Sequence, residues 1–216
     1  MYLIYQKIAH VKPRVIFCFL FLIFFAVLPG QTYFFDNYSN KDGLAQSKIY
    51  DLLQDNKNYL WLGTMAGVSK FDGHAFNNFT TINGLAPGGV RSIFQDSRGN
   101  IWFGHSDGGV STYDGKNFKV FKLANLLFHS DVTSITEDNK GRLWFTTEKS
   151  GAAVVHNPRA PVDSIKYEQY KGKRLSDRVY ASMIGHDGSV YLLTDVGVKK
   201  FNEHLKNSKK GLTTLF

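Results

Sequence analysis

The sequence predicts an all-β protein, a β-propeller of four-stranded blades with about four blades present, as a fragment of a larger propeller. Aromatic residues make up 15% of the chain and glycines number 20, a combination that suits short strands joined by tight turns. Tryptophan recurs at a spacing close to the length of one four-stranded blade. After the N-terminal segment, no stretch carries a sustained apolar stripe of helical period.

The chain opens with a basic and then strongly apolar segment. Lys7, Lys12 and Arg14 precede the apolar residues 15–28, which as a helix would span about 21 Å, less than the roughly 30 Å hydrocarbon core of a bilayer. A helix-breaking Pro-Gly pair follows. This order is typical of a secretory signal, so residues 1–30 are predicted to be a signal peptide or, alternatively, an uncleaved signal anchor. We therefore expect an exported, periplasmic or extracellular protein.

Four repeated units follow this segment. Their anchors are separated by 41, 42 and 47 residues and are Trp61, Trp102, Trp144 and Tyr191. A leucine precedes each unit at nearly the same period, at Leu44, Leu85, Leu126 and Leu175. The predicted blades are 44–80, 85–122, 126–170 and 175–216, and residues 33–38 are expected to form a strand that completes another blade. Four blades that do not close into a ring would leave exposed strand edges, so we favour a larger propeller of which these blades are one part. A ring of four blades closed by the strand at 33–38 is the alternative.

Each unit divides into four short strands separated by turn residues. Asp55, Asp96 and Asp138 begin the turns between the first and second strands, where an aspartate can accept backbone N–H groups two residues on. They are interpreted as turn-formers, not as catalytic carboxylates. The Asp-Gly pairs at 72–73 and 114–115 predict two-residue hairpins. The tryptophans on the second strands are expected to fill the space between neighbouring blades.

Charge and cysteine content exclude several classes of function. The net charge is +8, of which three positive charges lie in the N-terminal segment, and no run of Lys and Arg with interleaved aromatics occurs. We therefore expect no nucleic-acid partner. The single cysteine, Cys18, permits neither an intramolecular disulfide nor a cysteine metal site. His105, His129 and His156 have no metal-ligand spacing, and no phosphate-binding glycine loop is present, so no metal and no cofactor are expected.

The second unit resembles the two-component regulator propeller repeat. The resemblance rests on its Gly-Leu pair at 84–85, the run VRSIFQDSRGNIWFG at 90–104 and the Tyr-Asp-Gly at 113–115. It covers about residues 33–202 and is strongest at 43–122. The third unit departs from it at Thr146, where the repeat has Gly, and the fourth has Tyr191 for Trp and a turn, 186–188, that we interpret as shortened.

The resemblance implies the extracytoplasmic sensing region of a membrane-bound regulator. In that family a propeller precedes a transmembrane helix and a cytoplasmic signalling module, often a histidine kinase, and many members respond to glycans. We therefore expect further blades, a signalling module and a membrane link through the signal segment or a downstream helix, with no kinase activity in these residues. Alternatives are a secreted adhesion or interaction propeller and, less favoured, a propeller lyase or glycosidase.

The spacing of aspartate and aromatic residue bears on the enzyme alternative. Sialidase-type propellers place Asp five residues before Trp, whereas the separation here is six in three units. Streptogramin-lyase-like propellers place Asp four residues before the aromatic, and only Asp187 and Tyr191 fit. A glycosidase would also need two carboxylates at a fixed separation, which the sequence does not place.

The candidate ligand-binding residues lie on loops. In a propeller, the loop leading into a blade's first strand and the loop between its second and third strands open on one face. The first kind of loop corresponds here to 41–48, 82–90, 124–131 and 171–178, and the second to 64–67, 105–109, 147–152 and 195–197. Potential cations on or beside this rim are Lys48, Arg91, His105, His129, Lys149, Arg174 and Arg178. Such a rim would attract an acidic oligosaccharide, although ordinary solvated loop charge gives the same pattern.

Overall fold

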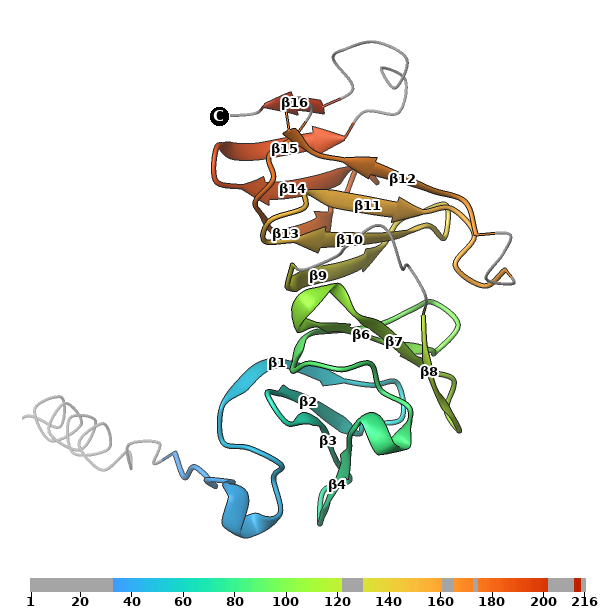
Figure 1. Ribbon diagram of the computed structural model, residues 1–216. Coiled ribbons are helices and arrows are strands. Elements are labelled where there is room, and N and C mark those ends of the chain that lie inside the picture. Colours follow the sequence, from blue (N-terminus) through green and yellow to red (C-terminus); the bar gives the residue numbers. More distant parts are fainter. Residues whose placement is uncertain (1–32, 122–129, 161–164, 173–174, 202–211, 215–216) are drawn as a thin grey trace, which may run out of the picture. The chain divides into compact units, whose positions relative to one another are not determined.

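The computed structural model describes residues 33–121, 130–160, 165–172, 175–201 and 212–214. The predicted signal segment with Cys18, as well as Leu126, His129 and Arg174, lies outside these ranges. The described residues form sixteen strands and three short 3-10 turns, with no α-helix among them (Figure 1). The all-β prediction is confirmed. No helix in these ranges is long and apolar enough to cross a membrane.

The strands form four separate four-stranded antiparallel sheets, each with its strands in sequence order. Blade 1 contains β1 (Ile49–Gln54), β2 (Leu60–Thr64), β3 (Gly67–Phe71) and β4 (Phe76–Phe79). Blade 2 contains β5 (Val90–Gln95), β6 (Ile101–His105), β7 (Val110–Tyr113) and β8 (Phe118–Val120). Blade 3 contains β9 (Val132–Glu137), β10 (Leu143–Thr147), β11 (Ala152–Val155) and β12 (Tyr167–Tyr170). Blade 4 contains β13 (Val179–Ile184), β14 (Val190–Thr194), β15 (Gly197–Phe201) and β16 (Leu212–Thr214).

The first strands of successive blades are neighbours: β1 contacts β5, β5 contacts β9, and β9 contacts β13. This places the first strand of every blade innermost and the fourth strand outermost. The four blades do not close into a ring, which confirms the prediction of an incomplete propeller. Residues 33–38 form no strand in this structure, so their role in completing another blade stays a prediction.

The tryptophans pack between blades, as predicted. Trp61 is fully buried and belongs to one apolar cluster with Val90 and Phe103 of blade 2. Trp102 packs in the same way on Phe145 of blade 3, with ring centres 6.1 Å apart. Trp144 is buried in a cluster with residues of blade 4. Each second strand therefore supplies the aromatic residue on which the next blade packs.

The turn aspartates also hold the tryptophans. Asp96 Oδ1 accepts the backbone N–H groups of Arg98 and Asn100, while Asp96 Oδ2 accepts the indole N–H of Trp102 at 3.0 Å. The same two-part pattern recurs at Asp55 and Asp138, with indole distances of 2.8 and 2.9 Å. The aspartates are turn-formers, as predicted, and their spacing of six residues from Trp is what lets one carboxylate reach both groups.

The glycine two residues after the tryptophan allows the next blade to approach closely. A Cβ at Gly63 would lie 2.9 Å from the carbonyl oxygen of Val90, and one at Gly104 would lie 2.6 Å from the Val132 side chain. A larger residue at either position would push the following first strand away. In blade 3 this position is Thr146, whose hydroxyl lies 2.9 Å from that of Thr133.

Two details of the predicted turns are wrong. The Asp-Gly connections contain four residues, not two, because Asp72 Oδ1 accepts the backbone N–H groups of both His74 and Ala75 and so fixes a wider turn. The turn before β14 is not shortened. Gly185 makes the same backbone bonds there that Asp96 makes in blade 2, so the aspartate has moved within a turn of equal length to position 187.

Candidate functional site

The loops leading into the first strands meet the loops between the second and third strands, which together form the predicted rim. In blade 2, the N–H of Ser106 donates to the carbonyl of Gly89 at 2.9 Å. In blade 3, the N–H of Glu148 donates to the carbonyl of Asp131 at 3.1 Å. In blade 4, the Ser176 hydroxyl donates to the Asp195 carboxylate. Hydrogen bonds therefore join the two kinds of rim loop in blades 2, 3 and 4.

The described rim candidates fall into two groups. Lys48 and Arg91 come together around the ring of Tyr50, at 5.2 and 4.3 Å from its centre. Lys149 and Arg178 are exposed on the rims of blades 3 and 4, and no described contact joins them to that pair. His129 and Arg174 lie outside the described residues, so their candidacy stays a prediction.

His105 is not a rim cation, which corrects the sequence-based expectation. The side chain is fully buried, and burial lowers the pKa of its imidazole, although a hydrogen bond to the Gly88 carbonyl acts in the opposite direction. Nε2 lies 3.0 Å from the hydroxyl of Ser111, which in turn accepts the N–H of Ala86. This network fits a neutral imidazole that donates through Nδ1 and accepts through Nε2.

Each first strand contains a β-bulge at its rim end. The pairing with the second strand skips one residue in every blade, and the skipped residues are Tyr50, Arg91, Thr133 and Tyr180. We call these four the bulge residues. A bulge bends the strand and redirects the side chain of the extra residue. The four blades therefore present one redirected side chain each at the same level of the innermost strands.

Arg91 links three blades through this position. It extends from blade 2 over the ring of Tyr50 in blade 1, and its Nη2 forms an ion pair with Asp131 at the start of blade 3. Its Nε is buried and has no hydrogen-bond partner in the described part of the chain. The sequence-based reasoning missed Tyr50 and Asp131. Alignment of the repeats could have identified Tyr50, because it occupies the same unit position as Arg91.

Acidic side chains on the same rim offset part of its positive charge. Besides Asp131, the rim loops carry Asp42, Asp107, Glu148, Asp177 and Asp195. Asp177 accepts the N–H of Gly172, and Asp195 accepts the Ser176 hydroxyl. The sequence-based reasoning counted only the cations. Among the described rim residues, Lys48 and Arg91 lie together at the Tyr50 ring, and the carboxylate of Asp131 offsets the charge of Arg91.

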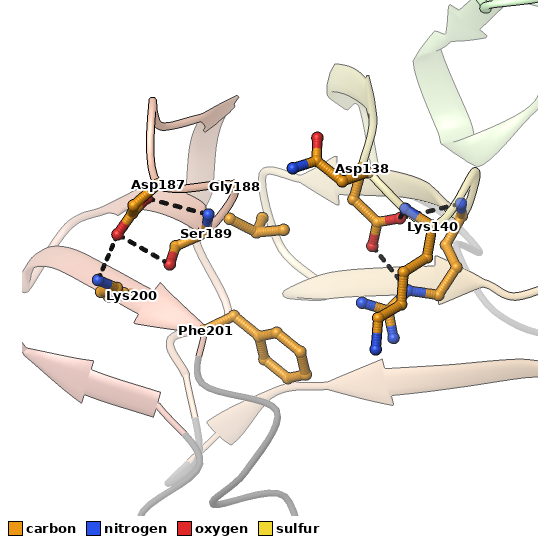
Figure 2. A pocket seen from close by; sticks show the side chains of 10 residues that line it. Asp138, Lys140, Asp187, Gly188, Ser189, Lys200 and Phe201 are labelled. Carbon is orange, nitrogen blue, oxygen red and sulfur yellow. Dashed lines mark hydrogen bonds and ion pairs between the residues drawn. The ribbon is translucent and has the colours of Figure 1, made fainter.

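A cavity of about 440 Å³ opens on the opposite face, between the first turns of blades 3 and 4. Figure 2 shows the Asp187–Lys200 pair on one side and Asp138 on the other. Lys200 donates to Asp187 at 2.7 Å, and this bond lowers the pKa of Asp187. Arg142 donates to Asp138 at 2.6 Å. These two ion pairs lie within blades 4 and 3 respectively, and the cavity is also lined by Lys140.

The described residues hold no group of three or more His, Cys, Asp or Glu arranged to bind a metal. The side chains at the rim and in the opposite cavity are mostly polar, with Arg, Lys and Asp at both places and Tyr50 at the rim. The rim cluster around Tyr50 has an aromatic ring, two cations and one donor without a partner.

Comparison with known proteins identifies the repeats. Residues 43–66, 84–107 and 126–149 match the family described as two component regulator propeller. A 56-residue stretch is 39% identical to histidine kinase P4 of Formosa agariphila, which covers 26% of this chain and 4% of that protein. Three segments of the chain thus match the two-component regulator propeller repeat, and the chain spans only a small part of this relative.

Solved structures share the fold. The extracellular domain of a B. thetaiotaomicron protein described as a hybrid two component system superposes with a TM-score of 0.61 at 18% identity, over 74% of this chain and 22% of that one. PorZ, a surface component of the type-IX secretion system of Porphyromonas gingivalis, gives 0.58 at 17% identity, over 76% and 26%. Virginiamycin B lyase of Staphylococcus aureus gives 0.55 at 16% identity, over 72% and 53%.

Proposed function

We propose that this chain is part of the extracytoplasmic, ligand-sensing propeller of a membrane-bound regulator of the two-component type. The observation that carries the proposal is the match of three successive units to the two component regulator propeller family. The identity to a histidine kinase and the shared fold of extracellular domains agree with it. In this proposal residues 1–30 direct export, and further blades and a signalling module belong to the whole regulator.

The ligand that we propose is an acidic oligosaccharide bound at the rim. Loops on a rigid scaffold are favourable places for binding, and the leading loops of blades 1 and 2 each contain a 3-10 turn that is capped at both ends. For example, Ser39 and Asp42 bond each other's backbone N–H groups before Gly43, which adopts a left-handed conformation with φ of 101°. The rim cations Lys48 and Arg91 supply the positive charge that an acidic ligand requires.

A binding panel tests this function. The exported chain is titrated with acidic and neutral oligosaccharides of equal length, at low and at high salt. We expect acidic ligands to bind at least about tenfold more tightly at low salt and to lose that advantage as salt screens the rim charges. Equal binding of acidic and neutral ligands would refute the acidic-ligand proposal. Recovery of the chain in the cytoplasm with residues 1–30 retained would refute the extracytoplasmic one.

A further inference from the structure

The first strands of blades 2 and 3 each end in a side chain that bridges to the turn of the preceding blade. Gln95 ends β5, and its Oε1 accepts the backbone N–H of Asn56 in blade 1 at 2.8 Å. Glu137 ends β9, and its carboxylate accepts the backbone N–H and the hydroxyl of Ser97 in blade 2, at 2.6 and 3.0 Å. We call the last residue of a first strand the bridging position. It carries an oxygen acceptor at both of these junctions.

The junction between blades 3 and 4 has no acceptor at the bridging position. The residue there is Ile184, which ends β13, and an aliphatic side chain accepts no hydrogen bond. The donor is still present, because Asn139 follows the turn aspartate of blade 3 as Asn56 and Ser97 follow theirs. The backbone N–H of Asn139 has no acceptor among the described residues. This junction therefore keeps the donor of the bridge and lacks its acceptor.

The cavity of about 440 Å³ opens between the first turns at this same junction. Asn139 lies on its blade 3 side and Gly188 on its blade 4 side. The two turns come close to each other there, since a Cβ at Gly188 would lie 2.4 Å from Asn139 Nδ2. Ile184 packs on the apolar cluster that contains Trp144. The donor that a bridging side chain would engage thus belongs to a residue that lines the cavity.

The charged residues that line the cavity favour an anion. Asp138 pairs with Arg142 at 2.6 Å, and Asp187 pairs with Lys200 at 2.7 Å. Lys140 is the fifth charged residue of the described lining, which thus has one cation more than it has anions. Figure 2 shows Lys140 and Lys200 on opposite sides of the cavity. A ligand with a single negative charge would balance this lining.

The junction between blades 2 and 3 indicates which anion suits the position. There a carboxylate, that of Glu137, accepts a backbone N–H and also a bond from the cation Arg159 at 3.1 Å. Hydrogen bonds from backbone N–H groups and cations to a carboxylate are among the strong ones. The cavity offers the same two kinds of group in the Asn139 N–H and Lys140. Phe201 also lines it and adds an apolar surface for a hydrocarbon group.

We propose that the cavity between blades 3 and 4 binds the carboxylate of a small organic acid, with the backbone N–H of Asn139 as the donor. The ligand oxygen takes the place that Glu137 Oε2 has one junction earlier. Lys140 adds positive charge, and the apolar part of the acid lies toward Phe201. The cavity is on the face opposite the rim, so this inference goes beyond the proposed function and does not depend on it.

The test compares phenylacetate with 2-phenylethanol, which has a primary alcohol in place of the carboxylate. The whole chain is titrated with each compound, and calorimetry gives the two dissociation constants. We expect the native protein to bind phenylacetate at least about tenfold more tightly. If phenylacetate binds no better than 2-phenylethanol, the inference is overturned.

Asn139→Pro removes the proposed donor and keeps the turn. Asn139 is the second residue of a turn that the Gly141 N–H closes on the Asp138 carbonyl, and this position favours proline. The variant should lose the preference for phenylacetate. Asn56→Pro is the matched control, because it makes the same change at the same turn position of blade 1, and it should keep the preference. A folded Asn139→Pro protein that keeps the preference would overturn the inference.

Ile184→Gln tests the site from the other side of the junction. It places at the bridging position the acceptor that Gln95 supplies between blades 1 and 2, so that the protein itself engages the Asn139 N–H without a change in charge. We expect this variant to lose the preference for phenylacetate, and Ile184→Leu, which stays apolar, to keep it. This pair decides the question should Asn139→Pro not fold, and retention of the preference by Ile184→Gln would then overturn the inference.

Discussion

At Asp96 a single buried carboxylate accepts two backbone N–H groups and an indole N–H, and it also pairs with Arg159 of blade 3 at 3.1 Å. Burial acts to raise the pKa of Asp96, but the bonds from Asn100, Trp102 and the backbone outweigh burial and lower it. The carboxylate is therefore ionised at neutral pH. It connects the turn, the inter-blade core and the next blade.

Asp96→Ala should lower the free energy of unfolding by about 3 kcal/mol, since it leaves the buried donors of the turn and the Trp102 indole without an acceptor and removes one of the two carboxylates that pair with Arg159. Denaturant unfolding measures the loss. Asp114→Ala is the control, because Asp114 also accepts two backbone N–H groups but lies in an exposed turn and binds no indole. Equal losses for the two variants would show that the indole and Arg159 bonds contribute nothing.

His105 predicts a pH dependence of stability. Its pKa is lowered in the folded state, chiefly by burial, so below its ordinary value of 6.5 the unfolded chain binds a proton that the folded chain does not. Stability is therefore complete above that pH and falls as the pH drops below it. We expect the denaturation midpoint to decrease from pH 7 to pH 5, and this decrease to be smaller in His105→Gln. An identical pH profile in both proteins would contradict the neutral, buried assignment.

The limits of prediction are clear at these residues. The turn role of Asp96 could be predicted from its position at the start of a Gly-containing turn. Its hydrogen bond with Trp102 could not be predicted, because it depends on the direction in which the indole N–H points. His105 looked like a loop cation, and its burial depends on Ser111, which β7 brings alongside only after the blade has folded. Tyr50 was missed because its equivalence to Arg91 becomes evident only when the first strands of the repeats are aligned with one another.

At the scale of the strand, the residue at one position of the repeat depends on the residue at a neighbouring position. Where blade 4 has Tyr191 in place of Trp, the aspartate at the start of the turn is replaced by Gly185. A Cβ at Gly185 would lie 2.5 Å from the Tyr191 ring. The Tyr191 hydroxyl instead reaches Asp187 Oδ2 at 3.3 Å. Gly185 and Tyr191 compensate for each other, because the tyrosine ring occupies the space that the aspartate side chain fills in the other blades.

Trp102→Ala should destabilise the protein by about 3–5 kcal/mol, because it removes a buried aromatic between blades 2 and 3 and leaves a cavity. Tyr191→Ala is the control at the same position of blade 4, where no further blade is packed on the residue, and its loss should be smaller. Denaturant unfolding of both variants measures the difference. An unchanged midpoint for Trp102→Ala would mean that the blade interface does not depend on this ring.

Strand positions were largely predictable, because alternating apolar residues and turn aspartates repeat in each unit. The predicted turn residues Asp55, Asp96 and Asp138 follow directly on β1, β5 and β9. The turns were less predictable, since the same Asp-Gly pair supports connections of different length. Asp72 selects the four-residue form by bonding His74 and Ala75, a choice that depends on side-chain geometry and not on residue type alone.

At the scale of the whole molecule, two blade faces have no partner among the described residues. In blade 2, the apolar face packs against Trp61 of blade 1 through Val90, Ile93, Ile101 and Phe103. The matching residues of blade 1 are Ile49, Leu52, Leu60 and Leu62, by the register of the first two strands. Leu52 is 58% exposed, whereas Ile93 is 8% exposed. Blade 4 exposes Met183 and Leu193 on its far face, at 60% and 47%.

These two faces predict that the chain from residue 31 onward associates in solution. Apolar sheet faces that are complementary to neighbouring blades inside the chain can meet the same kind of surface on another copy. We expect light scattering to show a mass that rises with concentration. Leu52→Lys and Leu193→Lys should each reduce this association, since each places a charge on one open face. Ile82→Lys is the control, because Ile82 is 94% exposed but lies on a leading loop and not on a blade face. A strictly monomeric chain at all concentrations would contradict open faces and would favour the alternative of a closed four-bladed ring.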